Sequence, residues 1–470
     1  MTQELRWLGA GELAEAYRSR RLDPVEVAAA LLDLAEADGT NAFCLIDRDE
    51  TLAQAAAARD RFAAGTSAGP LDGVPVSIKD LLYTAGWPTL RGSELITPES
   101  EPWTEDAPAV ARLREAGAVL LGKVTTPEFG WKGVTDSPRT GVTTNPWDRT
   151  RTSGGSSGGS ASAVAQGIGP LSIGTDGGGS VRIPGAFCGI VAMKPTYGLI
   201  PLWPASPFGT LSHAGPMTRS VADAAVALDV ITGFDHRDWS AMPTPATSFT
   251  DALGADDLAG VRVAYSPDLG YGRNEPGVQA AVERAVARLA DLGASVEQVE
   301  LGWDDPADAF HVLWFSGARQ VVAGYGPGAE ERIDPKIRAA LGRHGPFSAD
   351  DYIAANARRM DLGQRMGRLH RDHDVLVTPT LPRVAFEAGV DVPEGSASQD
   401  WTSWTPYTYP FNLTQQPAIT VPCGLVDGLP VGLQVVGARH RDDLVLRVAD
   451  AYERNADLGP VRPPEPGEGS

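Results

Sequence analysis

The feature of this sequence that most restricts its fold is a stretch rich in glycine and serine, from Arg151 to Gly189. Such a composition is usually that of a flexible linker. This stretch, however, contains ASAVAQGIG, which is typical of a packed helix, and PLSIGTD, which is typical of a strand. A linker would carry neither run. We therefore expect a packed backbone scaffold that holds serine hydroxyls in place.

Helical and strand-like segments alternate along the rest of the chain. DPVEVAAALLDLAEAD opens with Asp23 and Pro24, a good N-cap and first-turn pair, and has apolar residues at helical spacing. GVPVSIKD, at residues 73–80, predicts a short buried strand, and EDAPAVARLREAGAVLLGKV predicts a helix that stops at Gly117 before a strand. The alternation returns in GVRVAYSPD, PGVQAAVERAVARLADLG and ASVEQVEL, and later strands are expected at HDVLVTPTLP and GLPVGLQVVG. This order of elements indicates an α/β fold.

Composition and charge exclude several classes of protein. The 470 residues, of which 42% are hydrophobic, suffice for one large domain or two ordinary ones. A formal net charge of -20 repels phosphate backbones, so we expect no nucleic-acid partner. The first residues lack the apolar core of a signal peptide, and no run approaches the roughly 18 apolar residues of a membrane helix, so no membrane association is expected. Cys44, Cys188 and Cys423 lie far apart, which fits a reducing cytoplasm and argues against disulfides or a thiolate metal site.

A serine in the glycine-rich stretch needs a base to become a nucleophile. Residues 154–158 formally match G-x-S-x-G, but the segment before them is a poor strand, and His213 is only the least implausible histidine base. A phosphate-binding loop lacks its Lys-Ser or Lys-Thr, and metal hydrolysis lacks a ligand cluster. A neutral lysine can also act as a base, and Lys79 follows an apolar run that would lower its pKa by desolvation. From spacing alone, a salt bridge of Lys79 with a carboxylate such as Asp80 is the favoured alternative.

Several motifs together resemble those of the amidase signature family of serine hydrolases. They are GVPVSIKD, TSGGSSGGSASAVA, GTDGGGSVRIP and AMKPTYG, followed by GPMTRSVADAAVALDVI, NLTQQPAITVPCG and LPVGLQVVG. The resemblance covers nearly the whole chain and implies one three-layer α/β/α domain, in which a large mixed β-sheet is sandwiched between helices. We expect this domain to span residues 1–460, with core motifs at 73–198, helices at the pocket rim within 233–351 and a disordered tail at 461–470.

The resemblance also implies a Ser–Ser–Lys triad that cleaves the carbon–nitrogen bond of amides through a covalent acyl-enzyme. The lysine of the family falls on Lys79, the bridging serine, held there by a cis peptide bond, on Ser156, and the nucleophile on Ser180. Ser180 would pass its proton to Ser156, which hands its own to neutral Lys79, and the reverse relay would protonate the departing nitrogen. Ser157 is expected to be a polar scaffold residue.

Other roles follow from the same resemblance. The backbone N–H groups of Gly177, Gly178, Gly179 and Ser180 correspond to the oxyanion hole, and Asp176 and Arg182 are expected to form a structural pair that keeps this loop in shape. The candidate substrate-binding residues are Phe129, Gly130, Trp131, Trp203 and Gln415. Two positions depart from the family. Gly177 replaces a larger residue, which predicts a looser hole, and Gln415 replaces a glycine, which predicts a narrower or more polar pocket wall.

Aromatic residues around these positions favour an apolar or aromatic substrate. Small aryl amides and anilides fit best, with carbamates (urethanes) and linear oligoamides as related candidates, and an esterase or urethanase side activity is compatible with the chemistry. The alternatives are an amidotransferase A-type subunit of a tRNA-dependent complex and a non-catalytic homologue. All three triad residues are present, which favours the hydrolase. No cofactor and no metal are implied. We expect a small-molecule amide as the partner and a cytoplasmic monomer or homodimer.

Overall fold

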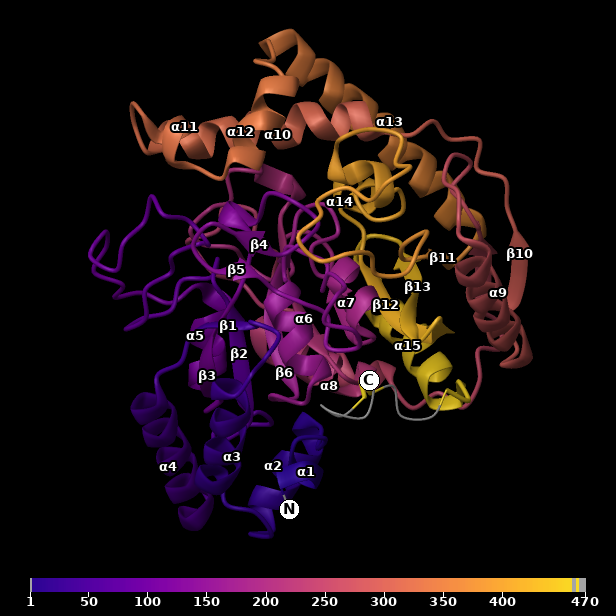
Figure 1. The fold of residues 1–470 in the computed structure, drawn as a ribbon. Coiled ribbons are helices and arrows are strands. Elements are labelled where there is room, and N and C mark those ends of the chain that lie inside the picture. Colours follow the sequence, from indigo (N-terminus) through magenta and orange to yellow (C-terminus); the bar gives the residue numbers. More distant parts are fainter. Residues whose placement is uncertain (1, 459–461, 465–470) are drawn as a thin grey trace.

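The computed structural model describes residues 2–458 and 462–464 (Figure 1). Most of the tail expected at 461–470 therefore lies outside the described residues. The described residues form fifteen α-helices. Their bounds are α1 Thr2–Leu5, α2 Ala10–Arg18, α3 Pro24–Glu36, α4 Arg48–Ala64, α5 Pro108–Glu115, α6 Gly158–Ala165, α7 Arg182–Cys188, α8 Val221–Ile231, α9 Pro276–Asp291, α10 Ala307–Gly324, α11 Ala329–Arg332, α12 Pro335–Arg343, α13 Ala349–Asp372, α14 Pro410–Leu413 and α15 Asp442–Asn455.

One large sheet runs through the described residues and contains eleven strands. In spatial order these are β1 Phe43–Leu45, β3 Val119–Val124, β2 Pro75–Lys79, β6 Leu171–Asp176, β8 His213–Thr218, β7 Val191–Lys194, β12 Ala418–Val426, β13 Leu429–Gly437, β11 Val375–Pro379, β9 Arg262–Tyr265 and β10 Ser295–Gln298. A separate two-stranded ribbon pairs β4 Asp136–Ser137 with β5 Gly141–Val142.

The sheet is mixed. Strands β3, β2 and β6 run parallel to one another, and so do β11, β9 and β10. Strand β1 is antiparallel to β3, and every neighbouring pair from β6 through β8, β7, β12 and β13 to β11 is antiparallel. Every residue of β2 and of β3 is buried. Parallel strands are covered on both faces, which explains why the sequences PVSIK and VLLGKV are almost continuously apolar.

Helices cover both faces of this sheet. A Cβ atom added to Gly437 of β13 would meet Val445 of α15, whereas one added to Gly432 of the same strand would meet Ala186 of α7. The two glycines are an odd number of residues apart, and side chains alternate along a strand, so α15 and α7 lie on opposite faces. The α/β fold with a large mixed sheet between helices, expected from the resemblance, is confirmed.

The glycine-rich stretch folds into α6, β6 and α7, and all residues of both helices are buried. The expected helix and strand inside it are therefore confirmed. Helix α6 begins three residues before the apolar run, in the glycines themselves. The reason is space, since a Cβ atom on Gly159 would lie 2.4 Å from the backbone nitrogen of Thr125. Only glycine lets this helix pack so closely on the end of β3.

Residues 233–351 do more than line a rim. Strands β9 and β10 extend the sheet, and helix α9 connects them, as their sequence pattern predicted. Helices α10 to α13 gather above one end of the sheet, at the top of Figure 1. Of the two groups, the upper one reaches the cavity described below, because α10 supplies Trp314 and Val321 to its wall.

Candidate active site

Lys79 is the last residue of β2, and its side chain is fully buried. Its Nζ atom lies 2.7 Å from Oγ of Ser156, 2.8 Å from Oγ of Ser157 and 2.9 Å from Oγ1 of Thr175. All three neighbours are neutral hydroxyl groups. The amine is therefore held in place by hydrogen bonds, without a charge partner at contact distance.

The neighbouring carboxylate does not pair with Lys79. Oδ1 of Asp80 lies 3.5 Å from Nζ of Lys123, another buried lysine of the sheet. No carboxylate of the described residues is within ion-pair distance of Lys79. The salt bridge between Lys79 and Asp80, which the spacing alone favoured, is thus wrong.

Burial lowers the pKa of Lys79 well below its ordinary value, because removing an ammonium from water costs far more free energy than removing an amine. The charge of Asp176 opposes this shift. That carboxylate, however, is already bound to Arg182, with 3.0 Å between Nε and Oδ2. Lys79 is consequently suited to be a neutral amine, whose lone pair can accept a proton from a hydroxyl.

Ser156 follows a cis peptide bond at Gly155–Ser156, as the resemblance implied. Gly155 packs tightly against the backbone of Val134, so a Cβ atom at position 155 would lie 2.5 Å from the carbonyl carbon of Val134. The side chain of Ser156 contacts Lys79 and also lines the main cavity of this region. Its hydroxyl therefore stands between the buried amine and the space open to a ligand.

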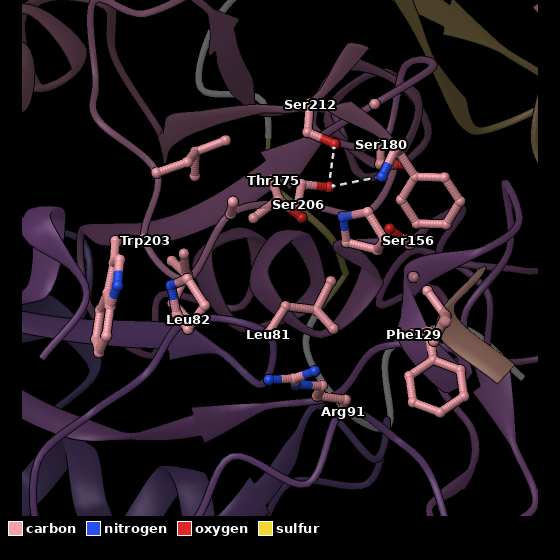
Figure 2. Close-up of a pocket in the computed structure, with 18 of the residues that line it drawn as sticks. Leu81, Leu82, Arg91, Phe129, Ser156, Thr175, Ser180, Trp203, Ser206 and Ser212 are labelled. Carbon is pink, nitrogen blue, oxygen red and sulfur yellow. Dashed lines mark hydrogen bonds between the residues drawn. The ribbon is translucent and has the colours of Figure 1, made fainter. Parts of the chain in front are cut away.

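Ser180 lies in the turn between β6 and α7 and lines the same cavity as Ser156. Its carbonyl oxygen accepts a hydrogen bond of 3.0 Å from the backbone nitrogen of Ser157, which ties the two serine loops together. Figure 2 shows Ser180 and Ser156 on the same side of the cavity. The fold thus gathers Lys79, Ser156 and Ser180 in one region.

The glycines before Ser180 do not all have free N–H groups. The N–H of Gly179 donates to Oδ1 of Asp176 at 2.7 Å. The N–H groups of Gly177, Gly178 and Ser180 have no acceptor among the described residues. Gly179, which has φ of +128°, therefore shapes the turn, and its N–H is not free to bind an oxyanion as the resemblance implied.

Aromatic rings occupy the space beside this turn. A Cβ atom on Gly177 would lie 2.7 Å from Cζ3 of Trp314, and one on Gly178 would lie 2.6 Å from Cη2 of Trp401 and 2.7 Å from Cζ of Phe310. The ring of Trp314 fills the volume that a larger residue at position 177 would take. The looser hole expected from Gly177 is therefore wrong.

The expected pair of Asp176 and Arg182 is present and fully buried. Arg182 also donates to Oδ1 of Asn412 at 2.7 Å and to Oε1 of Gln434 at 2.8 Å. Oδ2 of Asp176 in turn accepts the N–H of Val181 at 3.2 Å. Both charges of this buried pair are satisfied by hydrogen bonds. The network therefore holds the turn that carries Ser180 in place.

The cavity has a volume of about 140 Å³ (Figure 2). One part of its wall comes from the segment after β2 and from η1, a 3₁₀ turn at Glu128–Gly130, and another from the loop at residues 202–208. Its lining residues are Leu81, Leu82, Arg91, Phe129, Gly130, Ser156, Thr175, Gly177, Ser180, Leu202, Trp203, Pro204, Ala205, Ser206, Pro207, Phe208, Ser212, Trp314 and Val321. Most of these side chains are apolar or aromatic.

Two of the five expected substrate-binding residues lie elsewhere. Phe129, Gly130 and Trp203 line the cavity, but Trp131 and Gln415 do not. The carbonyl of Trp131 accepts a hydrogen bond of 3.0 Å from Nε1 of Trp314, and Trp131 lines a different cavity. The side chain of Gln415 donates to a backbone carbonyl at residue 210, at 3.4 Å, so it braces a loop and does not narrow the pocket.

Sequence reasoning did not single out Thr175, Arg91, Ser212 or Trp314, all of which line the cavity. Thr175 contacts Lys79 and lines the cavity, and its position immediately before Asp176 in the motif was a usable signal. Arg91, Ser212 and Trp314 also line the cavity, but they come from segments without a motif. Their role follows only from the fold.

No histidine of the described residues forms a hydrogen bond with Ser156 or Ser180. His213 is buried in β8, where its Nδ1 lies 2.9 Å from the carbonyl oxygen of Leu211, and burial lowers its pKa well below the ordinary value. Within the described residues, the ligand atoms of His311, His344 and Asp400 lie within 4.8 Å of one another. This group borders a different cavity, and Asp400 there already pairs with a neighbouring arginine at 3.0 Å.

The chain belongs to the amidase family, whose model, described as Amidase, matches residues 26–446. It is 38% identical over 460 residues to an acylamidase of Rhodococcus erythropolis, with 96% of each chain covered. It is also 36% identical over 490 residues to the A-type subunit of the glutamyl-tRNA(Gln) amidotransferase of Chloroflexus aggregans, covering 98% of this chain and 99% of that one.

A solved structure gives the same answer. The crystal structure of a bacterial aryl acylamidase of the amidase signature family superposes with a TM-score of 0.89 at 30% sequence identity, covering 96% of each chain. The family resemblance read from the motifs is confirmed, and the chain is an amidase-family enzyme acting on amides. No helix of the described residues has both the length and the apolar character that crossing a bilayer requires.

Proposed function

We propose that this enzyme hydrolyses apolar or aryl amides, anilides above all, through an acyl-enzyme on Ser180. One observation carries the proposal. A fully buried Lys79, lacking a carboxylate partner among the described residues, contacts Ser156 at 2.7 Å beside a cavity that Ser180 lines. A lysine in this setting has the lowered pKa that a base needs, and a hydroxyl connects it to the nucleophile's cavity.

In the proposed reaction, Oγ of Ser180 attacks the amide carbonyl carbon. Its proton passes to Ser156, whose own proton passes to Nζ of Lys79. The N–H groups of Gly177, Gly178 and Ser180 stabilise the oxyanion of the tetrahedral intermediate. Collapse of this intermediate breaks the carbon–nitrogen bond, and the proton returns through Ser156 to the leaving nitrogen. Water then repeats the sequence and releases the acid from Ser180.

The substrate class is inferred from the wall of the cavity. Phe129, Trp203, Phe208 and Trp314 offer flat apolar surfaces close to Ser180, which suits an aromatic ring on the acyl or amine side of the scissile bond. The names of two relatives, an acylamidase and an aryl acylamidase, point the same way. Carbamates and linear oligoamides have a similar carbonyl–nitrogen bond and belong in the same panel, as do esters.

The second candidate function is that of an amidotransferase A-type subunit. It is favoured by the relative from Chloroflexus aggregans, which matches over nearly the full chain. Such a protein would work with partner chains, whereas a stand-alone amidase would turn over small anilides by itself. A non-catalytic homologue would do neither. These three functions differ in what the purified chain does alone.

The test combines covalent labelling with turnover. The purified chain is treated with a fluorophosphonate probe, and the labelled peptide is identified by mass spectrometry, with S180A as the control. Turnover is then measured on anilides, carbamates, linear oligoamides, esters and glutamine. Labelling at Ser180 with cleavage of anilides is expected. Cleavage of glutamine alone would favour the amidotransferase function, and an unlabelled, inactive but folded chain would favour the non-catalytic homologue.

A further inference from the structure

Arg91 places a guanidinium group in the wall of the Ser180 cavity. The lining of the same cavity includes Leu81, Leu82 and Phe129, which are apolar. Figure 2 shows Arg91 on the side of the view opposite Ser180, with Leu81 between them. Arg91 therefore places a positive charge in the same cavity as Ser180, with the apolar side chain of Leu81 between the two in this view.

The contacts of Arg91 leave its charge without a carboxylate. One guanidinium nitrogen donates to the hydroxyl of Tyr83 at 2.8 Å, and Cζ lies 5.3 Å from the centroid of that ring. Arg91 also interacts with Tyr325, where it opposes the rise that burial causes in the pKa of the phenol. Glu101, the carboxylate next in line, accepts the Tyr83 hydroxyl at 2.6 Å. None of the carboxylates in the described residues forms an ion pair with Arg91.

A second arginine, which lies against the cavity residue Trp203 without lining the cavity itself, shows the contrast. The guanidinium carbon of Arg237 lies 4.9 Å from the ring of Trp203, but this arginine has its own carboxylate in Asp235, at 2.9 Å. The chain has 60 acidic and 40 basic residues, so carboxylates are in excess. Leaving Arg91 without one is therefore a local property of the cavity, and its unused N–H groups suit a carboxylate, which they can bind in a bidentate manner.

We propose that Arg91 binds a carboxylate of the substrate, so that the preferred amides carry an anionic group remote from the scissile bond. This inference rests on the proposed function of the cavity. The apolar side chains between Ser180 and Arg91 would hold the hydrocarbon or aryl part, and the guanidinium would fix the charged end. Substrates of this class are half-amides of dicarboxylic acids and N-acylated amino acids or aminobenzoates.

The test uses matched pairs that differ in one charge. The acyl arm compares the 4-nitroanilides of succinate, glutarate and adipate with those of butyrate, pentanoate and hexanoate. The amine arm compares N-acetyl-3-aminobenzoate and N-acetyl-4-aminobenzoate with acetanilide. We expect kcat/KM of the wild type to be higher for the charged member by about 10- to 100-fold in one arm, the effect of a hydrogen bond between charged groups.

The variants isolate the charge from the fold. R91Q should remove this preference by lowering kcat/KM on the charged member far more than on the neutral member, and R91K should retain part of it. R237Q is the matched control, since Arg237 already has a carboxylate, and it should leave the preference unchanged. Thermal melting of each variant shows that it folds, and competitive inhibition by 4-phenylbutyrate, weaker in R91Q, gives a readout independent of turnover.

Three results would overturn the inference. The first is equal kcat/KM on charged and neutral members in both arms, the second a preference for the neutral members, and the third a preference that R91Q keeps. In each of these cases Ser180 remains labelled and anilides are cleaved, so the proposed function stands. If the wild type cleaves no member of the panel and Ser180 is not labelled, the proposed function fails, and the inference about Arg91 fails with it.

Discussion

The amine of Lys79 lies 2.7 Å from the hydroxyl of Ser156 and 2.9 Å from that of Thr175, and both hydroxyl residues reach the cavity of Ser180. Either hydroxyl could in principle carry a proton from the cavity to the amine. The resemblance to the family motif favours Ser156. The geometry leaves Thr175 as the competitor, and substitution separates them.

We expect S156A to lower kcat on an anilide by about 10²- to 10⁴-fold, the usual contribution of a group that transfers a proton. T175V keeps the shape of the side chain and should cost about tenfold or less, the effect of one hydrogen bond to Lys79. Steady-state kinetics on both variants, with circular dichroism as the folding control, give the answer. A larger loss in T175V than in S156A would reverse the two roles.

Lys79 should matter more for amides than for esters. An amine leaves poorly without a proton, whereas an alkoxide leaves more readily, and in the proposed reaction Lys79 is the group that returns the proton. We therefore expect K79A to lower kcat/KM on an anilide by at least about tenfold more than on the matched aryl ester. Equal losses on the two substrates, measured under single-turnover conditions, would contradict the relay.

The pH profile should follow the neutral form of Lys79. Because burial lowers its pKa in the folded protein, the amine becomes neutral at a lower pH than an ordinary lysine. Activity should be lost as the pH falls through this folded pKa and should rise from neutral into mildly alkaline solution. Over the interval between the folded and unfolded pKa values, the unfolded chain binds more protons, so the contribution of Lys79 to stability increases with pH. A kcat/KM maximum below pH 6 would disagree with a lysine base.

The contact between Gly177 and Trp314 predicts coupled substitutions. G177A puts a Cβ atom 2.7 Å from the indole, so we expect it to lower the free energy of unfolding by about 1–3 kcal/mol and to reduce kcat. W314F removes the clashing part of the ring. In the W314F background the cost of G177A should therefore shrink, which a double-mutant cycle by urea denaturation measures. Additive effects would show that the ring does not limit position 177.

The elements with a strong local sequence pattern were predicted correctly from the sequence. The apolar runs of β2, β3 and β13 and the capped start of α3 at Asp23, whose carboxylate accepts from the nitrogen of Val25 at 2.8 Å, appear where expected. Strand β8 was not predicted, because HAGPMT contains glycine and proline and has neither period. It forms because β6 and β7 pair with it on either side. Tertiary pairing overrides local propensity there.

The site divides in the same way. Lys79 and Ser156 stand in motifs, so the resemblance placed them. Arg91 and Trp314 reach the cavity only through the fold, and no local pattern marks them. Trp131 was misplaced because a turn separates it from its neighbour Phe129, which has φ of +56° and faces the cavity while Trp131 faces away.

The buried contacts of Arg182 have a consequence for the order in which this molecule matures. Its side chain joins Asp176 to Asn412 and Gln434, which are separated from it by 230 and 252 residues. A ribosome-bound chain that already contains every residue of the Lys79 region still lacks Asn412 and Gln434, the distant partners of Arg182. Hydrolytic competence should accordingly arrive late in synthesis, and turnover of a chromogenic anilide would report that the last strands have docked.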